Sequence, residues 1–565
     1  MRQFWRAWGT AVVAGFALST LGAQTAGLPA GYRSPVDHPI RVSGTFGELR
    51  ADHFHMGLDV KSARGRSGDA LYAVAEGFVS RIKISAAGYG NAVYVDHPDG
   101  MRSLYAHLET LAPDLQAFAD SVHYARESFE IDVRLSPKQL PVTRGQRLGT
   151  MGNTGSSFGA HLHYELRRAA DDVAVNPVLA GFDIRDARAP DIRGLSVYGV
   201  DGDGRTTLLR QLTPVGAGGG YRVDQVVDVP AGRIAFGLKA VDRVENQSNR
   251  NGVFRTVVRV GEGDAERETW RVTYDSIAYE HTRYVQAHYD FAAKATGEGY
   301  YYRLHRLPGD SLGVYEAPGD GSVVVGFGES LPVEVATEDA FGNRAVLRFE
   351  VRGTDQQPKS GLAPFNFVIA PGQAASFRLG DAAFEVPPGA AYAKTFLPAD
   401  LRAARLTGAL SRCYDVGAAT EPIHDAITVR VPLRNVPAGL RSKAYLGPCD
   451  PDPDDGDTDG RWREVPTRLS ADGESLVGEL EAWRPFAVYV DTVPPSVREI
   501  AAGVWHIEDD VTAARALRYR VTEDGKWVLA ELDAKRNRLV VRRDKWAGGP
   551  LRVTVEDESG NVRER

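Results

Sequence analysis

Short runs of alternating apolar and polar residues recur along most of the chain, between clusters of glycine, proline and aspartate. Residues 233–242, 330–339 and 427–433 are clear examples. Alternation with a period of two is typical of strands that bury one face. Many such strands, each bounded by turn residues, favour β-sandwiches. The pattern therefore predicts a mainly β protein with several sandwich modules after about residue 186.

The part of the chain before residue 186 also reads as strands and turns. Residues 92–95 and 102–105 predict a hairpin, and a further strand is expected at about 161–167, after a glycine-rich stretch. The apolar residues of the segment 113–128 instead recur at helical spacing. We expect a short amphipathic helix there.

The length of the chain and changes in its residue pattern suggest several domains. A chain of 565 residues corresponds to about three to five domains. The expected parts are a signal peptide at 1–23, a first domain at 24–185, β-sandwich modules at 186–262 and 263–354, a β-rich module at 355–490, and a C-terminal Ig-like module at 491–565.

The N-terminus predicts export. Arg2 and Arg6 precede an apolar run that ends near Leu21, and small residues follow. This is the pattern of a secretory signal, and we expect cleavage after Ala23. Since later apolar stretches are too short to span a bilayer, the mature protein is expected in the periplasm or outside the cell.

Composition narrows the classes of partner. The formal net charge of −7 argues against a nucleic-acid-binding protein, which would carry a basic face. Cys413 and Cys449 are the only cysteines, and their spacing leaves a disulfide and two free thiols both open. The acidic stretch 449–460 matches the start of a calcium loop, but Pro466 stands where a bidentate acid is needed. A solvated surface loop is favoured.

A faint internal repeat runs through the later modules. Residues 240–246, 336–343 and 555–561 each contain the end of an alternating strand, an aspartate and a later asparagine. Both residue types suit turns, because their side chains bond nearby backbone N–H groups.

Histidines and carboxylates gather in three segments of the first domain. His55 and Asp59 are four residues apart in "HFHMGLD", so they share a face in a strand or a helix. Alone, this pair is more often a simple hydrogen-bonded pair than a metal site.

The second segment, "HLHYEL", raises the expectation of a metal. His161, His163 and Glu165 fall on one face of the expected strand, and the apolar residues between them face the other way. His107 follows another strand. Two histidines and a carboxylate with an open fourth position form a catalytic zinc arrangement, and further histidines remain for proton transfer. Glu165 is expected either to orient a ring nitrogen or to be a solvated strand residue.

Together these motifs resemble the lysostaphin-type, or LytM-like, zinc endopeptidases. The resemblance covers about residues 35–180 and rests on H-x-x-x-D, a lone histidine, and H-x-H after a glycine-rich turn. It implies that His55, Asp59 and His163 bind Zn²⁺. It further implies that His161 is the general base and that His107 is the other catalytic histidine, which we expect to donate to the oxyanion.

The resemblance also implies hydrolysis of peptide cross-links in bacterial peptidoglycan. Two alternatives remain: a non-catalytic binding or regulatory protein on the same fold, and a zinc peptidase that acts on protein substrates. Non-catalytic relatives generally lack zinc ligands, whereas here every expected ligand is present, which favours an enzyme. About thirty residues separate His107 from the glycine-rich segment, more than is usual in the family. We expect this insertion to form a flap beside the cleft, or else a surface insertion far from the metal.

Overall fold

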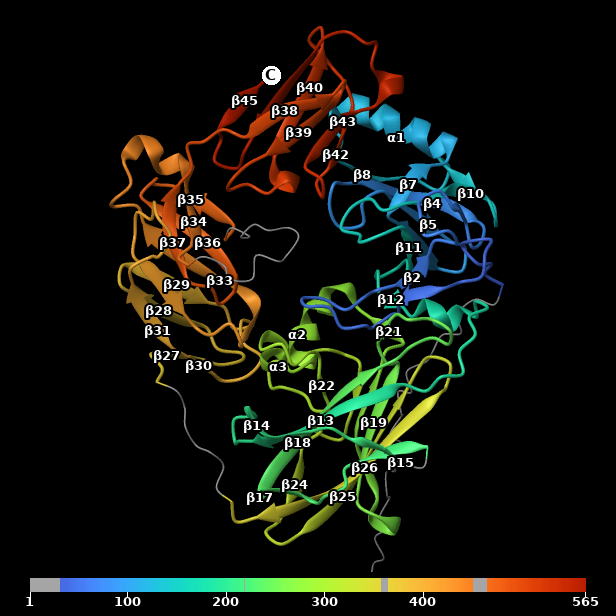
Figure 1. Cartoon of the computed structure of the whole chain (residues 1–565), viewed down its shortest axis with the longest axis vertical. Helices are drawn as coiled ribbons and strands as arrows, with labels where there is room; N and C mark the ends of the chain where they lie inside the picture. The colour runs from blue at the N-terminus through green and yellow to red at the C-terminus, as the bar shows by residue number, and fades with distance from the viewer. Residues whose placement is uncertain (1–30, 218, 357–363, 451–464) are drawn as a thin grey trace, which may run out of the picture.

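The computed structural model describes residues 31–217, 219–356, 364–450 and 465–565. The predicted signal peptide and most of the acidic stretch lie outside the described residues. Strands dominate, which confirms the predicted fold class (Figure 1). Among the described helices, none combines the length and the apolar character needed to cross a bilayer.

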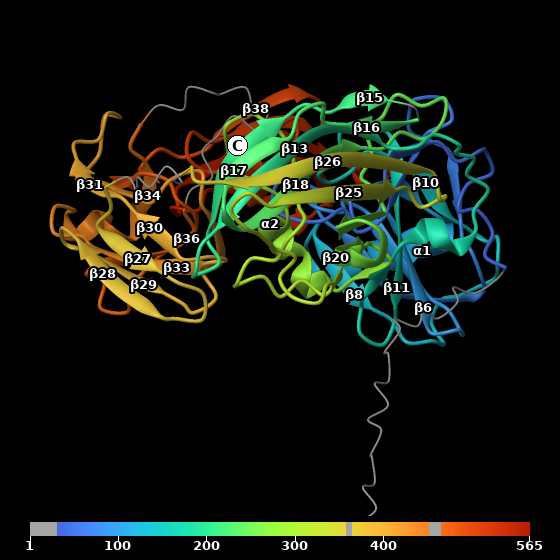
Figure 2. The same ribbon diagram turned by 90° about the horizontal axis from the view of Figure 1, so that it is seen from below.

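Four parts follow one another around a ring in Figure 1. We name them the first domain (residues 31–185), the sandwich (186–356), the third module (364–490) and the C-terminal module (491–565). In the view from below, the first domain and the third module lie at opposite ends of the molecule with the sandwich between them (Figure 2).

The first domain is built on one large, mainly antiparallel sheet. Along the sheet the strands run β1 (Val42–Gly44), β2 (Leu58–Lys61), β11 (His161–Arg168), β6 (Met101–Ala106), β5 (Ala92–Asp96), β4 (Gly77–Ile84) and β8 (Ile131–Arg134). A small second sheet consists of β3 (Ala70–Tyr72), β10 (Arg147–Met151) and β7 (Leu108–Leu111). The predicted hairpin (β5 and β6) and the predicted strand at 161–167 (β11) are confirmed.

The sandwich joins two segments that we expected to be separate modules. Its smaller sheet contains β13 (Asp191–Val200), β14 (Thr206–Leu212), β18 (Gly232–Val241), β22 (Tyr302–Arg303) and β24 (Val323–Val325). Its larger sheet contains β15 (Val215–Ala217), β16 (Gly220–Arg222), β17 (Val227–Pro230), β19 (Arg255–Val260), β20 (Arg267–Thr273), β23 (Tyr315–Glu316), β25 (Ser330–Glu338) and β26 (Arg344–Thr354). Both sheets take strands from either side of residue 262 and share one core, so the expected boundary there does not divide the structure.

The first domain and the sandwich are also continuous with each other. Strand β12 (Ala174–Val175) extends the large sheet and pairs with β21 (Ser276–Ile277) of the sandwich. Phe46 and Phe54 of the first domain are buried in the core of the sandwich. Conversely, Val244 of the sandwich is buried in the core of the first domain. Such exchange of apolar side chains fixes the two parts against each other.

The last two parts are β-rich as well. The third module has sheets built around β33 (Pro422–Pro432) with β36 (Ser475–Ala482), and around β34 (Ala444–Pro448) with β37 (Phe486–Val490). A disulfide joins Cys413 to Cys449 there, which settles the alternative that the spacing left open. The C-terminal module has two four-stranded sheets. The first contains β38 (Ser496–Ala501), β39 (Val504–Glu508), β43 (Arg538–Val541) and β42 (Ala530–Asp533). The second contains β41 (Lys526–Trp527), β40 (Arg518–Glu523), β44 (Leu551–Glu556) and β45 (Val562–Glu564).

The insertion closes the ring. Its helix, α1 (Pro113–Arg126), confirms the predicted helix and is packed into the first domain through buried Leu115 and Ala119. Its other side meets the C-terminal module, where Asp120 lies 2.6 Å from Arg542. The insertion is thus held between two parts of the chain, and its role as a flap beside the cleft stays a prediction.

Candidate metal centre

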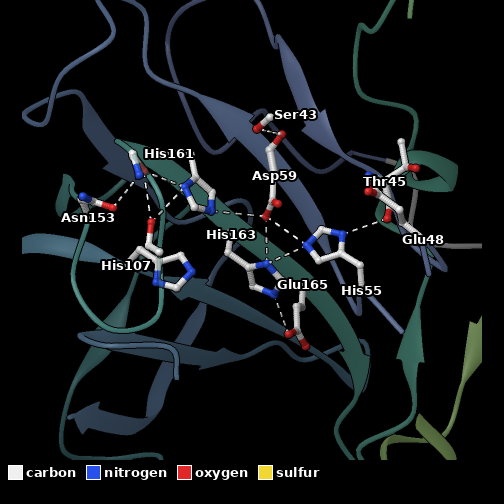
Figure 3. Close-up of polar contacts among 12 residues, drawn as sticks. Ser43, Thr45, Glu48, His55, Asp59, His107, Asn153, His161, His163 and Glu165 are labelled. Carbon is white, nitrogen blue, oxygen red and sulfur yellow. Dashed lines mark hydrogen bonds and ion pairs between the residues drawn. The ribbon is translucent and has the colours of Figure 1, made fainter. Parts of the chain in front are cut away.

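The register of the large sheet brings the candidate residues together. Asp59 of β2 lies directly opposite His163 of β11, and Ala106 of β6 flanks His163 on the other side. Opposed residues of antiparallel strands place their side chains on the same face. His161, two residues before His163, therefore borders the same spot. His107 lies just after the end of β6, in a left-handed backbone conformation, and its ring centroid is 5.9 Å from that of His163 (Figure 3).

Three potential ligand atoms converge there. Asp59 Oδ1 lies 3.0 Å from His55 Nε2 and 2.9 Å from His163 Nδ1, and these two ring nitrogens are 3.0 Å apart. All three side chains are buried. Sequence reasoning named these three residues as ligands, and the structure brings them together. Two imidazoles and one carboxylate form a donor set suited to zinc.

The hydrogen bonds on the outer side of each ligand ring fit a metal. His55 Nδ1 donates to the Thr45 carbonyl at 2.8 Å, and His163 Nε2 donates to Glu165 Oε1 at 2.8 Å. Since a carbonyl or carboxylate oxygen only accepts, the outer nitrogens carry the protons. In each neutral ring the inward nitrogen therefore offers a lone pair to a cation.

Electrostatics favour a positive charge at the same point. Burial by itself lowers the pKa of His163, but its bonds to Asp59 and Glu165 outweigh burial and raise this pKa to about 9. Burial likewise opposes ionisation of Asp59, yet the two neighbouring imidazoles hold its pKa well below its ordinary value. The pocket that stabilises an imidazolium cation also stabilises a metal cation.

Glu165 is the centre of a buried network. Its side chain has no exposed surface and accepts hydrogen bonds from His163, from the Tyr89 hydroxyl at 2.6 Å and from Arg167 Nε at 2.6 Å. Burial opposes its charge, but Arg167 and His163 lower its pKa to about 2. Of the two alternatives for Glu165, the structure supports orientation of a ring nitrogen and excludes a solvated residue.

His161 presents a free nitrogen to the ligand cluster. Its Nδ1 donates to the Gly159 carbonyl at 2.9 Å and lies 3.2 Å from Ser157 Oγ. Its Nε2 lies 3.6 Å from Asp59 Oδ1. The neutral ring can therefore accept a proton beside the ligand atoms, as a general base requires.

His107 faces His161 at a distance of 4.9 Å between ring centroids. Its backbone has φ of 63°, a left-handed conformation uncommon outside glycine, and its Nδ1 donates to the Thr154 carbonyl at 2.8 Å. Burial, with the neighbouring imidazoles adding to it, lowers its pKa to about 3. The neutral ring thus offers Nε2 as an acceptor, whereas the expected oxyanion donor needs a proton there.

The C-terminal module touches the loop that orients these two rings. The glycine-rich loop, residues 152–160, supplies the carbonyls of Thr154 and Gly159. Lys535 of the C-terminal module donates to the carbonyls of Asn153 and Ser157 at 2.5 and 3.0 Å. His53, by contrast, is exposed and bonds Asp52, apart from the cluster.

Sequence reasoning missed the supporting groups. Thr45, Thr154 and Gly159 act through backbone carbonyls, which any residue type carries, so their identities give no signal. The role of Arg167 could have been inferred, because it follows Glu165 by two residues and so lies on the same face of β11.

Residues 53–119 match the sequence model of Peptidase family M23. The chain is 32% identical over 164 residues to the DD-carboxypeptidase/endopeptidase Mpg of Neisseria meningitidis serogroup B. The aligned region covers 29% of this chain and 29% of that relative. It is 30% identical over 138 residues to the murein hydrolase activator NlpD of Escherichia coli K12, covering 24% of this chain and 28% of the relative.

Among solved structures, the catalytic domain of lysostaphin from Staphylococcus simulans is similar. The identity is 21%, the match covers 25% of this chain and 90% of that one, and the TM-score is 0.18. The chain thus spans under a third of the length of the curated relatives named above.

Proposed function

Starting from a first domain that belongs to Peptidase family M23, as its motifs indicated, we propose that this protein is an exported zinc-dependent endopeptidase. Its substrate would be the peptide cross-links of bacterial peptidoglycan. The observation that carries the proposal is the convergence of three inward-facing imidazole nitrogens, those of His55, His163 and His161, on one buried carboxylate, Asp59. The similarity to a DD-carboxypeptidase/endopeptidase of Neisseria and to a murein hydrolase activator of Escherichia supports a role in the cell envelope.

In this proposal, His55, Asp59 and His163 hold the zinc ion. Bound there, zinc would polarise the scissile carbonyl and lower the pKa of a bound water. His161 Nε2 takes the proton of the attacking water, since its Nδ1 is already committed to the Gly159 carbonyl. The proton then passes to the leaving amine.

His107 would act as an acceptor that orients the attacking water. Its neutral tautomer, fixed by the Thr154 carbonyl, leaves a lone pair on Nε2. The carbonyls of the glycine-rich loop hold both catalytic rings, so that loop sets the direction in which each ring accepts a proton.

A non-catalytic activator is the second candidate. The similarity to the murein hydrolase activator NlpD favours it. The complete set of ligand and base side chains argues for catalysis instead, because an activator needs no ordered base beside a metal site.

The test compares four proteins on purified peptidoglycan sacculi. The wild type, His163→Ala, His161→Gln and the exposed control His53→Ala are loaded with zinc, and released fragments are separated by mass. We expect the wild type and His53→Ala to release uncrosslinked peptides. His163→Ala should bind zinc poorly, whereas His161→Gln should bind zinc normally and still fail to cleave.

The outcomes separate the candidates. Release of fragments by His161→Gln at the wild-type rate contradicts the assigned base. Stoichiometric zinc in the wild type without any release, but with stimulation of an added murein hydrolase, establishes the activator instead. Cleavage of an unstructured protein but not of sacculi moves the substrate from peptidoglycan to protein.

A further inference from the structure

Three aspartates meet where the first domain joins the sandwich. Asp186 lies in the connecting segment, Asp242 follows β18, and Asp339 follows β25. One carboxylate oxygen from each lies within 4.8 Å of the others. Asp242 and Asp339 are 2% and 3% exposed, and Asp186 is half-buried, so the cluster has one open side.

Backbone N–H groups satisfy only part of this cluster. Asp186 Oδ1 accepts from the N–H groups of Arg188 and Glu245 at 3.0 Å each. Asp339 is bonded through both oxygens within its own turn. Asp186 Oδ2 and Asp242 Oδ1 are buried and have no hydrogen-bond partner among the described residues. Buried carboxylate oxygens without a partner are costly unless a cation neutralises them.

A fourth, independent side chain faces the cluster. Asn251 pairs with Asp242 in an antiparallel bridge, with N–H···O distances of 3.0 and 2.9 Å, so the two side chains lie on the same side. Asn251 is 3% exposed, yet neither its Oδ1 nor its Nδ2 has a hydrogen-bond partner in the described structure. An amide carbonyl is a common calcium ligand.

Among the described residues, neighbouring cations offset only part of the negative charge of the cluster. The guanidinium groups of Arg188 and Arg243 are drawn to Asp191, at 3.2 and 3.9 Å. Burial, with the negative charge of Asp339 adding to it, raises the pKa of Asp242 to about 7. Within the described part of the chain, the negative charge at this point is therefore only partly compensated.

We propose that Asp186, Asp242, Asp339 and Asn251 form a calcium-binding site at the junction of the first domain and the sandwich. The donors are all oxygens, which suit a hard cation and not zinc. Three carboxylates and an amide, with an open side for water, can supply the six to eight oxygens that calcium takes.

A second trio repeats the arrangement in the C-terminal module. Asp491, Asp509 and Asp557 also lie within 4.8 Å of one another. Asn561 Nδ2 donates to the Asp491 carbonyl at 3.2 Å, as Asn343 Nδ2 donates to the Asp186 carbonyl at 3.2 Å. This likeness explains the sequence repeat. At the second trio, however, the Lys443 ammonium bonds Asn561, so we confine the proposal to the first.

The proposed calcium site is connected to the candidate metal centre. Shortly after Asn251, the Gly252 N–H lies 3.2 Å from Thr45 Oγ1, and the Thr45 carbonyl orients His55. Val244, between Asp242 and Asn251, is buried in the core of the first domain. Calcium would thus hold the loop of Asn251 and Gly252, which contacts Thr45 and so supports the orientation of His55.

The test measures calcium binding to the mature full-length protein by equilibrium dialysis against radioactive Ca²⁺ after chelator treatment. Asp242→Asn is the main variant, since it removes charge and keeps shape. The exposed Asp264→Asn in the same sandwich is the matched control. We expect Asp242→Asn to bind one ion fewer than the wild type, and Asp264→Asn to bind the same number.

Thermal unfolding gives a second readout. Calcium should raise the melting temperature of the wild type and of Asp264→Asn, and should raise that of Asp242→Asn less. If Asp242→Asn does not fold, Asp186→Asn, at the open side, takes its place. A wild type that binds no calcium, or equal numbers of ions in the wild type and the folded variant, overturns the proposal.

Discussion

Replacing Glu165 with glutamine tests how the candidate metal ligand His163 is held in place. Glu165 is fully buried and accepts from three donors, on His163, Tyr89 and Arg167. Glutamine has almost the same shape but supplies one acceptor oxygen and one NH₂ group. At least one of the three donors must therefore lose its acceptor and face another donor.

The structure gives the magnitude of the effect on stability. The pKa of Glu165 falls from 4.5 to about 2, which at 1.36 kcal/mol per unit corresponds to about 3 kcal/mol. Because the folded pKa is the lower one, this contribution is present above pH 4.5 and is lost as the pH falls towards 2. It agrees with the 3–5 kcal/mol expected, in order of magnitude, when a buried ion pair loses one partner.

Two assays follow. Urea unfolding of the metal-free protein at pH 7 should show Glu165→Gln less stable by about 3 kcal/mol. The exposed control Glu109→Gln should change by at most about 0.5 kcal/mol. Competition with a zinc chelator should show roughly 10–100-fold weaker binding, because His163 loses its fixed orientation. A loss of stability below about 1 kcal/mol with unchanged zinc affinity would refute this reasoning.

Three further predictions concern other parts of the chain. Lys535→Ala should slow turnover on sacculi about fivefold, because the glycine-rich loop loses hydrogen bonds worth about 1 kcal/mol. The control variant Lys526→Ala, at an exposed position, should leave turnover unchanged. The double variant Cys413→Ser, Cys449→Ser should lose about 4 kcal/mol, from a sequence separation of 36; an unchanged melting curve contradicts this. Burial, with the positive charge of Arg303 adding to it, lowers the pKa of His288 to about 3. Below pH 6.5 this histidine is protonated in the unfolded chain but not in the folded one, so the free energy of unfolding should fall by about 1.4 kcal/mol per pH unit. His288→Gln should flatten that slope in urea titrations at several pH values.

Local pattern was enough to predict the hairpin of β5 and β6, the strand β11, the helix α1 and the face of β11 that carries the site. The period of two in "HLHYEL" puts His161, His163 and Glu165 on one side of β11, and the structure agrees. The pairing of Asp59 with His163 could not be predicted in the same way, because alternation fixes which side a residue faces but not which strand lies beside it.

The same limit explains the boundary expected at 262. Strands on either side of it alternate alike, and nothing in a strand's own pattern says whether its partner is twenty or a hundred residues away. Strand β19, for example, pairs with both β20 and β25. Phe46 and Phe54 look like core residues of the first domain, but burial propensity does not say which core receives them.

The exchange of side chains between the first domain and the sandwich limits how far the first domain can be moved between proteins. A chain cut at residue 185 would leave Phe46 and Phe54 facing water and β12 without its partner on β21. Apolar surface and an open strand edge together favour self-association. A folded chimera or a shortened version of the chain would have to keep the sandwich. In this protein, the unit that protein engineering or recombination can transfer is therefore about 320 residues long, roughly two domains of ordinary size.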